Sequence, residues 1–153
     1  PQMTIQSSYD DFTTVFVSID PMTDIQSTPC PCGTHQRYID CCGRFLENAE
    51  TPDTAEILMR SRYAAYTLKR EQYLLMTWHP STRPASLELT QPPDRRWLGL
   101  TVKQHVQSDA EHATVEFIAR YKIAGKAYRL HEISRFVCES KIWLYIDGDL
   151  LED

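Results

Sequence analysis

The pattern of apolar and polar side chains changes its period near the middle of the chain. Between residues 54 and 78, apolar side chains recur every three or four positions, which is typical of one face of a helix. From Leu87 onward they alternate with polar side chains, which is typical of one face of a strand. Helices first and strands second predict an α+β fold.

Two helices are predicted in the first half of the chain. Segment 54–69 should be the longer one, since Asp53 stands as an N-cap acceptor three residues before Glu56, in the form of a capping box. The predicted buried stripe of this helix consists of Ala55, Leu58, Met59, Arg62, Ala65 and Tyr66. A shorter helix is predicted over 71–78, and Pro80 should end it because the residue before a proline avoids the helical region.

The second half of the chain is predicted to form consecutive strands. The alternating segments are 97–106, 115–121, 128–138 and 142–146. Turns are expected at 123–126 and 139–141, so the strands that they join should pair antiparallel, in a meander. We therefore expect a sheet that wraps a short helical pair.

One face of the segment 128–138 mixes apolar and polar side chains. Glu132 and Ser134 alternate in step with apolar neighbours on the same strand, so both should point inward. A carboxylate on an apolar face needs a partner, and Arg60 or Arg62 of the first helix is the candidate. Such a pair could either fix the packing or supply the polar groups of a ligand pocket.

Other residues with acid–base or thiol chemistry are placed by the same pattern. His131 should lie on the outer face of the sheet, so it cannot form a dyad with Glu132. Trp78 and His79, at the end of the second helix, complete the predicted pocket, and His79 is better placed for proton transfer. Cys138 is most simply a small buried apolar side chain.

Composition limits the classes of function. The chain has 153 residues, of which 42% are apolar and 24% charged, as in a folded protein. A formal net charge of −5 argues against broad binding to nucleic acid or to an anionic membrane, because both require a basic surface. No apolar run approaches the ~20 residues of a membrane span, and 15–17 is too short for a signal-peptide core. We therefore expect a cytoplasmic protein.

Four of the five cysteines form a cluster at Cys30, Cys32, Cys41 and Cys42. Two close pairs of thiolates at this spacing predict a zinc knuckle, and four ligands would close the shell of a structural metal ion. Disulfides within the cluster are the alternative, but adjacent cysteines bridge only with strain, and a cytosolic thiol pool would keep the others reduced. The expected cofactor is one structural zinc ion bound by four thiolates.

The cluster divides the chain into three parts. Residues 1–28 form a polar N-terminal extension, in which the apolar stretch 12–19 allows either a short strand or a flexible arm. Residues 29–46 hold the predicted knuckle, and 50–150 hold the predicted helices and strands.

Several motifs carry a resemblance to known families. Residues 30–43 contain Cys-Pro-Cys-Gly and Asp-Cys-Cys-Gly and resemble the SEC-C motif that ends the bacterial translocase ATPase SecA. Met-Arg-Ser-Arg-Tyr at 59–63, Trp-His-Pro-Ser-Thr at 78–82 and Leu-His-Glu-Ile-Ser at 130–134 are similar to the bacterial YchJ family. The resemblance implies a nuclear transport factor 2-like (cystatin-like) cone, in which a curved antiparallel sheet closes over helices. It also implies a family whose function is largely uncharacterised.

This chain departs from the SEC-C pattern in two places. Gly33 is followed by Thr34, His35 and Gln36, where the motif usually continues with Ser-Gly-Lys. Cys42 stands where SecA-type knuckles commonly have a histidine ligand. The expected metal shell is therefore four thiolates, with His35 as the alternative ligand.

The resemblance favours a non-enzymatic adaptor among the possible functions. In that hypothesis the knuckle docks to a protein or ribosomal partner through Arg37, Tyr38 and Arg44, of which Arg37 and Tyr38 should be solvent-exposed. The alternative is a small-molecule-binding protein, or a hydrolytic or isomerase-type enzyme, that uses the cone pocket with Glu132 or His79 as general base. The fold alone cannot decide between them.

Overall fold

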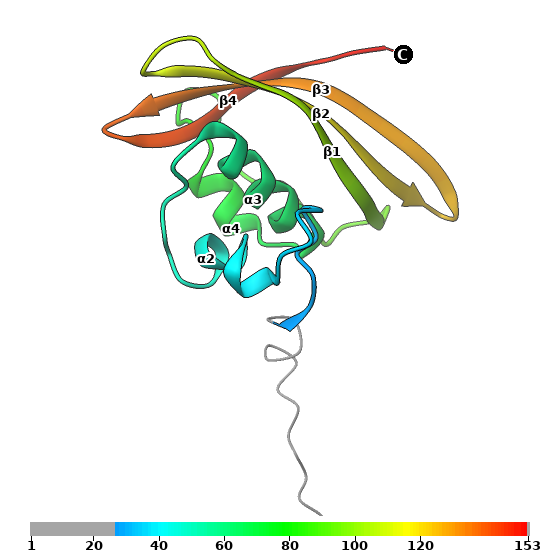
Figure 1. Ribbon diagram of the computed structural model, residues 1–153. Helices are drawn as coiled ribbons and strands as arrows, with labels where there is room; N and C mark the ends of the chain where they lie inside the picture. The colour runs from blue at the N-terminus through cyan, green and yellow to red at the C-terminus, as the bar shows by residue number, and fades with distance from the viewer. Residues whose placement is uncertain (1–26, 153) are drawn as a thin grey trace, which may run out of the picture.

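The structure is a computed structural model that describes residues 27–152. The predicted extension 1–28, with its optional strand at 12–19, lies outside the described residues except for Ser27 and Thr28. A curved antiparallel sheet covers one side of the molecule, and the helices lie together under its concave face (Figure 1). The α+β architecture expected from the sequence is therefore confirmed.

Within residues 38–76, three helices and one 3₁₀ turn precede the sheet. They are η1 (Tyr38–Asp40), α2 (Gly43–Leu46), α3 (Ala55–Thr67) and α4 (Glu71–Met76). Both predicted helices are thus present: α3 begins one residue later and ends two residues earlier than predicted, and α4 begins as predicted and ends two residues earlier. Among the residues that the structure describes, no helix is long and apolar enough to cross a membrane.

Helix α3 is the central element of the helical layer. Its N-cap is Thr54, whose hydroxyl accepts a hydrogen bond from the Ile57 amide at 3.1 Å, so the predicted capping box at Asp53 and Glu56 is wrong by one residue. The predicted stripe is buried apart from a half-buried Tyr66. Ser61, Tyr63 and Ala64 are buried as well, because α3 lies between the sheet and the N-terminal segment.

The sheet is a four-stranded meander in the order β1-β2-β3-β4. Its strands are β1 (Arg95–Gln107), β2 (His112–Ile123), β3 (Lys126–Glu139) and β4 (Ile142–Leu150). Ala124 and Gly125 have positive φ angles, as do Ser140 and Lys141, so both predicted hairpins close through two left-handed residues. The predicted meander is confirmed.

The inner face of β1 differs from the predicted alternation. Trp97 and Leu100 both pack against the core, whereas Leu98 is 46% exposed. A register shift between Trp97 and Gly99 inserts one residue and switches the face, and a second shift follows Val102. Strict alternation over the predicted segment 97–106 would put Leu98 on the same face as Leu100 and Val102, and this expectation is wrong because a β-bulge interrupts the period of two.

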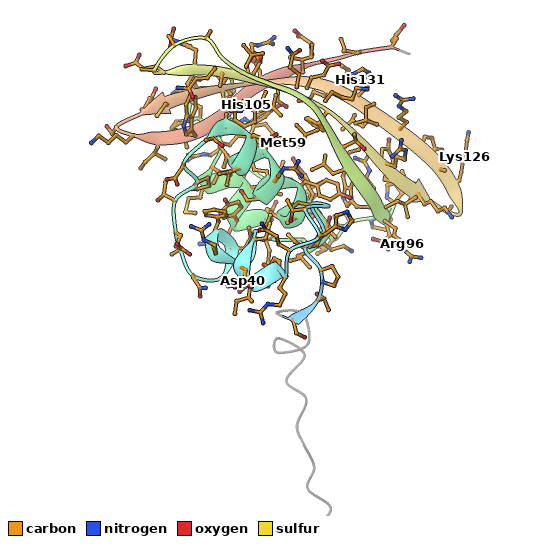
Figure 2. The ribbon with its side chains drawn as sticks, in the orientation of Figure 1. Asp40, Met59, Arg96, His105, Lys126 and His131 are labelled. Carbon is orange, nitrogen blue, oxygen red and sulfur yellow. The ribbon has the colours of Figure 1, made fainter. Side chains whose placement is uncertain are left out.

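The N-terminal segment packs into the same core as the helices and the sheet. Cys30, Cys32, Tyr38 and Cys42 belong to one cluster of buried side chains with Leu58 of α3. In Figure 1 this segment lies beside α3 and the nearby end of β1. Figure 2 shows Met59 on the sheet side of α3, and His131 on the outer side of the sheet. The knuckle segment is thus part of the domain's core.

Candidate functional site

The four clustered cysteines converge as the sequence predicts. Their sulfur atoms all lie within 4.8 Å of one another, and the cluster could hold a metal ion. Cys30, Cys32 and Cys42 are buried, and Cys41 is half-buried. His35, the alternative ligand, is exposed and is not part of the cluster. All four thiols are free, and the Cys32 and Cys41 sulfurs lie 3.6 Å apart, much farther than a disulfide bond.

The sulfur atoms share hydrogen bonds with one another and with Thr34. The Thr34 hydroxyl lies 3.2 Å from the Cys41 sulfur and 3.7 Å from the Cys32 sulfur. The hydrogen bond with Cys42 lowers the pKa of Cys41 to about 6, and hydrogen bonds with Cys30 and Cys42 lower the pKa of Cys32. Hydrogen bonds with Cys30, Cys32 and Cys41 raise the pKa of Cys42. The cluster therefore favours thiolates at some of its positions.

Two glycines and one arginine fix the loops around the sulfurs. Gly33 has φ +85°, and Gly43 leaves no space for a side chain because a Cβ there would lie 2.6 Å from the Tyr38 carbonyl oxygen. The Arg60 guanidinium donates to the Cys32 carbonyl oxygen at 2.9 Å. Arg60 therefore joins α3 to the cysteine loop, and the prediction that it could face Glu132 is wrong.

The predicted docking residues do not share one exposed surface. Tyr38 is 1% exposed, and its hydroxyl donates to Glu47 at 3.0 Å, so its predicted exposure is wrong. Arg37 is exposed and pairs with Asp40, three residues later on the 3₁₀ turn. Arg44 is exposed as well and pairs with Glu50.

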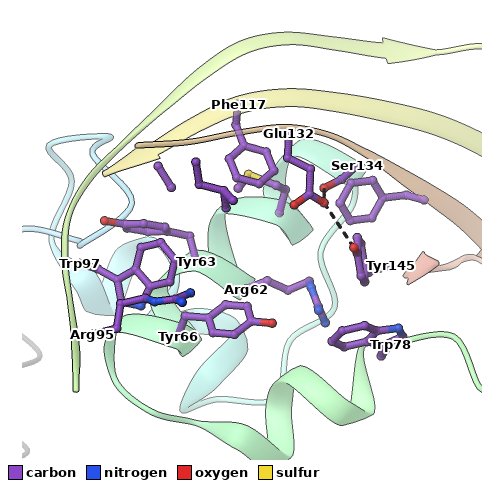
Figure 3. A pocket seen from close by; sticks show the side chains of 14 residues that line it. Arg62, Tyr63, Tyr66, Trp78, Arg95, Trp97, Phe117, Glu132, Ser134 and Tyr145 are labelled. Atoms are coloured by element: carbon purple, nitrogen blue, oxygen red, sulfur yellow. Dashed lines mark hydrogen bonds between the residues drawn. The ribbon is translucent and has the colours of Figure 1, made fainter. Parts of the chain in front are cut away.

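A cavity of about 180 Å³ lies between α3 and the concave face of the sheet (Figure 3). Of the predicted pocket residues, Arg62, Trp78, Glu132 and Ser134 line it. The other lining residues are Met59, Tyr63, Tyr66, Arg95, Trp97, Phe117, Ala119, Leu130, Phe136 and Tyr145. Figure 3 shows Trp97, Tyr63 and Arg95 at one end and Trp78 and Tyr145 at the other.

The sheet positions one carboxylate over the cavity. Glu132 accepts hydrogen bonds on Oε1 from the Ser134 hydroxyl at 2.8 Å and from the Tyr145 hydroxyl at 3.3 Å. Burial, followed by the charge of Glu132, raises the pKa of Tyr145, so this phenol remains a hydrogen-bond donor at neutral pH. The carboxylate is thus held by two neutral hydroxyl groups.

Helix α3 supplies the cation opposite this carboxylate. Arg62 is 6% exposed and donates through Nη1 to the Leu74 carbonyl oxygen at 2.8 Å and to the Thr77 hydroxyl at 2.7 Å. Its guanidinium carbon lies 5.0 Å from the Trp78 ring centre and 4.7 Å from that of Tyr145. Burial lowers the pKa of Arg62, but an arginine stays charged at neutral pH.

His79 lies outside this cavity, so its predicted place in the pocket is wrong. Its amide donates to the Tyr145 carbonyl oxygen at 2.7 Å, which fixes the 78–82 loop to β4. Its ring joins Ser81 at Nδ1 and Glu139 at Nε2, both at 2.7 Å. Ser81 and Glu139 are exposed and His79 is half-buried, and none of the three borders the cavity.

Sequence reasoning missed most of the aromatic wall and the second arginine. Arg95 is the first residue of β1 and precedes the predicted strand, which began at residue 97. Tyr145 lies in β4, where no pattern of polar residues distinguished it. The alternation of side chains along β2 could have placed Phe117 on the inner face of the sheet, because Phe117 pairs with Glu132 and the two side chains share one face. The predicted outer position of His131 is confirmed, and its Nε2 lies 2.8 Å from Glu116.

Comparisons with known proteins agree with this fold. The family model of the YchJ middle NTF2-like domain matches residues 54–148. A UPF0225 protein from Cupriavidus metallidurans is 57% identical over 130 residues, which are 81% of this chain and 90% of that protein. A UPF0225 protein from Bordetella pertussis is 55% identical over 124 residues, or 79% of this chain and 92% of that protein.

Two solved structures are similar to this one. The solution structure of a SEC-C motif containing protein from Rhodopseudomonas palustris has a TM-score of 0.72 and 32% identity, and it covers 82% of this chain and all of that chain. The crystal structure of another SEC-C motif containing protein, from Psychrobacter arcticus, has a TM-score of 0.70 and 28% identity. It covers 84% of this chain and 86% of that chain. The chain therefore belongs to the UPF0225 family and carries the YchJ-type, NTF2-like cone with a SEC-C cysteine cluster.

Proposed function

We propose that this protein binds a small organic ligand in the cavity between α3 and the sheet, and that a zinc ion in the cysteine cluster stabilises the fold. The observation that carries the proposal is the lining of the cavity, where Arg62 and Glu132 lie among aromatic rings. A mostly apolar cavity with a few convergent polar groups is the usual form of a ligand site.

Zinc is the metal that fits the cluster best. A tetrahedral shell with zinc–sulfur bonds of about 2.3 Å places sulfur atoms about 3.8 Å apart. The Cys32 and Cys41 sulfurs lie 3.6 Å apart, and all four sulfurs lie within 4.8 Å. Soft thiolates select zinc over the hard cations magnesium and calcium. A shell of four protein ligands leaves no open position, so the role of the metal is structural.

The size of the cavity limits the ligand to a small molecule. An apolar cavity of about 150 Å³ accepts benzene, whereas drug-sized ligands need about 300–1,000 Å³. At about 180 Å³, this cavity fits one six-membered ring with one or two small substituents.

Docking of the cysteine segment to a protein or ribosomal partner stays a prediction. Its support is reduced because Tyr38 is buried, which removes the aromatic ring from the expected docking surface. Arg37 and Arg44 remain exposed, although each is paired with a carboxylate. A cytoplasmic location agrees with the proposal, since a reducing compartment keeps thiols available for zinc.

A titration with phenol tests the cavity as a ligand site. We expect phenol to shift the amide NMR signals of cavity-lining residues, with saturation in the millimolar range. Ala119 lines the cavity and is 1% exposed, so Ala119→Met should fill the space and abolish the shifts. Ala127→Met, on the outer face of β3, is the control and should leave them unchanged. A folded wild-type protein without these shifts would contradict the proposal.

A further inference from the structure

The two arginines of the cavity have different surroundings. Arg62 is buried, and its charge is opposed by the Glu132 carboxylate, with which it interacts electrostatically across the cavity. Arg95 is exposed, and among the described residues its guanidinium has no hydrogen bond or ion pair. The formal charges of Arg62, Arg95 and Glu132 leave one positive charge at the cavity, in a chain whose net charge is −5. This positive charge is local and unpaired.

Aromatic rings hold the Arg95 guanidinium at the mouth of the cavity. Its central carbon lies 4.4 Å from the Tyr121 ring centre and 5.6 Å from that of Trp97. Arg95, Tyr66 and Trp97 also border a second hollow, of about 310 Å³, on the side of the 87–93 loop. Arg95 therefore stands between solvent and the cavity. A guanidinium stacked on rings keeps its N–H edge available, and that edge matches the geometry of a carboxylate.

The wall of the cavity next to Arg95 is aromatic. The Trp97 ring lies 5.6 Å from Tyr63 and 6.0 Å from Tyr66, measured between ring centres. These rings contact one another edge-on or tilted, with interplanar angles of 75° and 51°, and all three line the cavity, so a ligand here would meet aromatic surface. In Figure 3, Arg95 lies beside Trp97 at one end of the cavity, whereas Glu132 lies away from it, between Phe117 and Ser134.

The inner end of the cavity offers a hydrogen-bond acceptor. Both hydroxyl donors of Glu132, from Ser134 and Tyr145, bond to its Oε1 atom. Among the described residues no donor reaches the other oxygen, Oε2. A ligand hydroxyl or amine placed at Oε2 would donate a charge-assisted hydrogen bond to this carboxylate.

We infer that the ligand is a planar, ring-bearing monoanion that carries a second polar group able to donate a hydrogen bond. Its carboxylate binds Arg95 at the mouth, its ring packs against Trp97 and Tyr66, and its donor binds Glu132. This inference rests on the proposed function and adds the chemical class of the ligand. Cationic rings are disfavoured by the net positive charge of the lining, and neutral rings gain no ion pair.

Three phenols of similar shape test the ligand class. We choose 4-hydroxybenzoate as the anion, phenol as the neutral ring and tyramine as the cation, each titrated into the metal-loaded protein by calorimetry and NMR. We expect 4-hydroxybenzoate to bind at least ten-fold more tightly than phenol, and tyramine more weakly than phenol. The Arg95→Gln variant should remove the preference for the anion while the affinity for phenol stays within two-fold.

Arg96 provides the matched control, because it is the next residue of β1, is exposed and does not line the cavity. Arg96→Gln changes the net charge by the same amount and should keep the ten-fold preference. Binding of phenol without any preference for the anion would overturn the ligand class and leave the cavity as a ligand site. Absence of binding by all three compounds would overturn the proposed function as well. A preference that survives Arg95→Gln would overturn the role of Arg95.

Discussion

The carboxylate of Glu132 lies against Gly148 on the neighbouring strand, in the space that a side chain at residue 148 would fill. A Cβ atom built on Gly148 would overlap the Glu132 Oε1 atom and come within 2.8 Å of its Cδ atom. Gly148 is the Cα partner of Ser134, which donates to that same carboxylate. The glycine therefore gives the carboxylate its place beside two hydroxyl donors.

We predict that Gly148→Ala displaces the Glu132 side chain without unfolding the protein. The overlap is with the end of a side chain that can rotate, whereas the hydrogen bonds from Ser134 and Tyr145 depend on its position. The affinity for 4-hydroxybenzoate should fall about ten-fold, which corresponds to about 1.4 kcal/mol. Gly99→Ala is the control, because a Cβ there meets no atom within 4 Å. Equal affinities for the two variants would contradict the prediction.

We predict that the freshly purified, reduced protein contains one zinc ion per chain. Cys41→Ser removes one of four converging ligands and should release the metal, with a loss of more than about 4 kcal/mol of unfolding free energy. Cys138→Ser, which changes the cysteine outside the cluster, should keep the metal. Elemental analysis together with chemical unfolding measures both quantities. A substoichiometric metal content in the wild-type protein would reject the zinc assignment.

We predict that Arg60 slows release of the metal. Its hydrogen bond to the Cys32 carbonyl oxygen joins α3 to the loop that carries two of the four sulfurs. Arg60→Met should lower the free energy of unfolding by about 1–2 kcal/mol and speed zinc transfer to a chelator. Arg44→Met removes an exposed arginine paired with Glu50 and should change neither value appreciably. Identical transfer rates for both variants would show that Arg60 does not brace the loop.

We predict that the protein loses stability between pH 10 and pH 12. Burial raises the pKa of Tyr73 from 10 to about 12, although its hydrogen bond with Ser61 opposes the shift. A phenol with a raised pKa in the folded state contributes its full stability below the unfolded-state pKa. That contribution is lost as the pH rises toward the folded-state pKa. A pKa shift of two units corresponds to about 3 kcal/mol of unfolding free energy.

Chemical unfolding as a function of pH measures this loss. Tyr73→Phe removes the titrating group, so its free energy of unfolding should fall less steeply above pH 10 than that of the wild type. Tyr128→Phe, at a residue that is 38% exposed, should keep the wild-type slope. The same slope in all three proteins would exclude Tyr73 as the source.

The parts of the fold that depend on local chemistry could be predicted from the sequence. The change of period located the helices and the meander, because burial on one face repeats every three to four residues in a helix and every two in a strand. The spacing of the cysteines in the sequence located the metal cluster, because the ligands of one metal ion must lie close together. Glu132 and Ser134 were placed on the inner face by the same alternation.

The parts that depend on long-range packing could not be predicted in this way. Arg60 and Arg62 are two positions apart on α3, and only the packing of the cysteine loop on one side decided which of them faces the cavity. The bulge after Trp97 moved Leu98 to the outer face, and its sequence signal was a single glycine within the strand, Gly99. Tyr38 was buried by contacts with Glu47 and with the core, which lie beyond its own turn.

The burial of the cysteine segment in the domain core affects how this protein can be divided. Cys32 is fully buried in the same cluster as Leu58, and Gly33 lies against the carbonyl of Leu100 on β1. In this chain the cysteine segment is therefore not a separate domain, because it shares its core with α3 and the sheet. A truncation that begins at residue 50 would leave an apolar surface on α3 without cover, and a gene fusion carrying only residues 29–46 would lack the wall against which they pack. We therefore expect the two parts to fold as one unit.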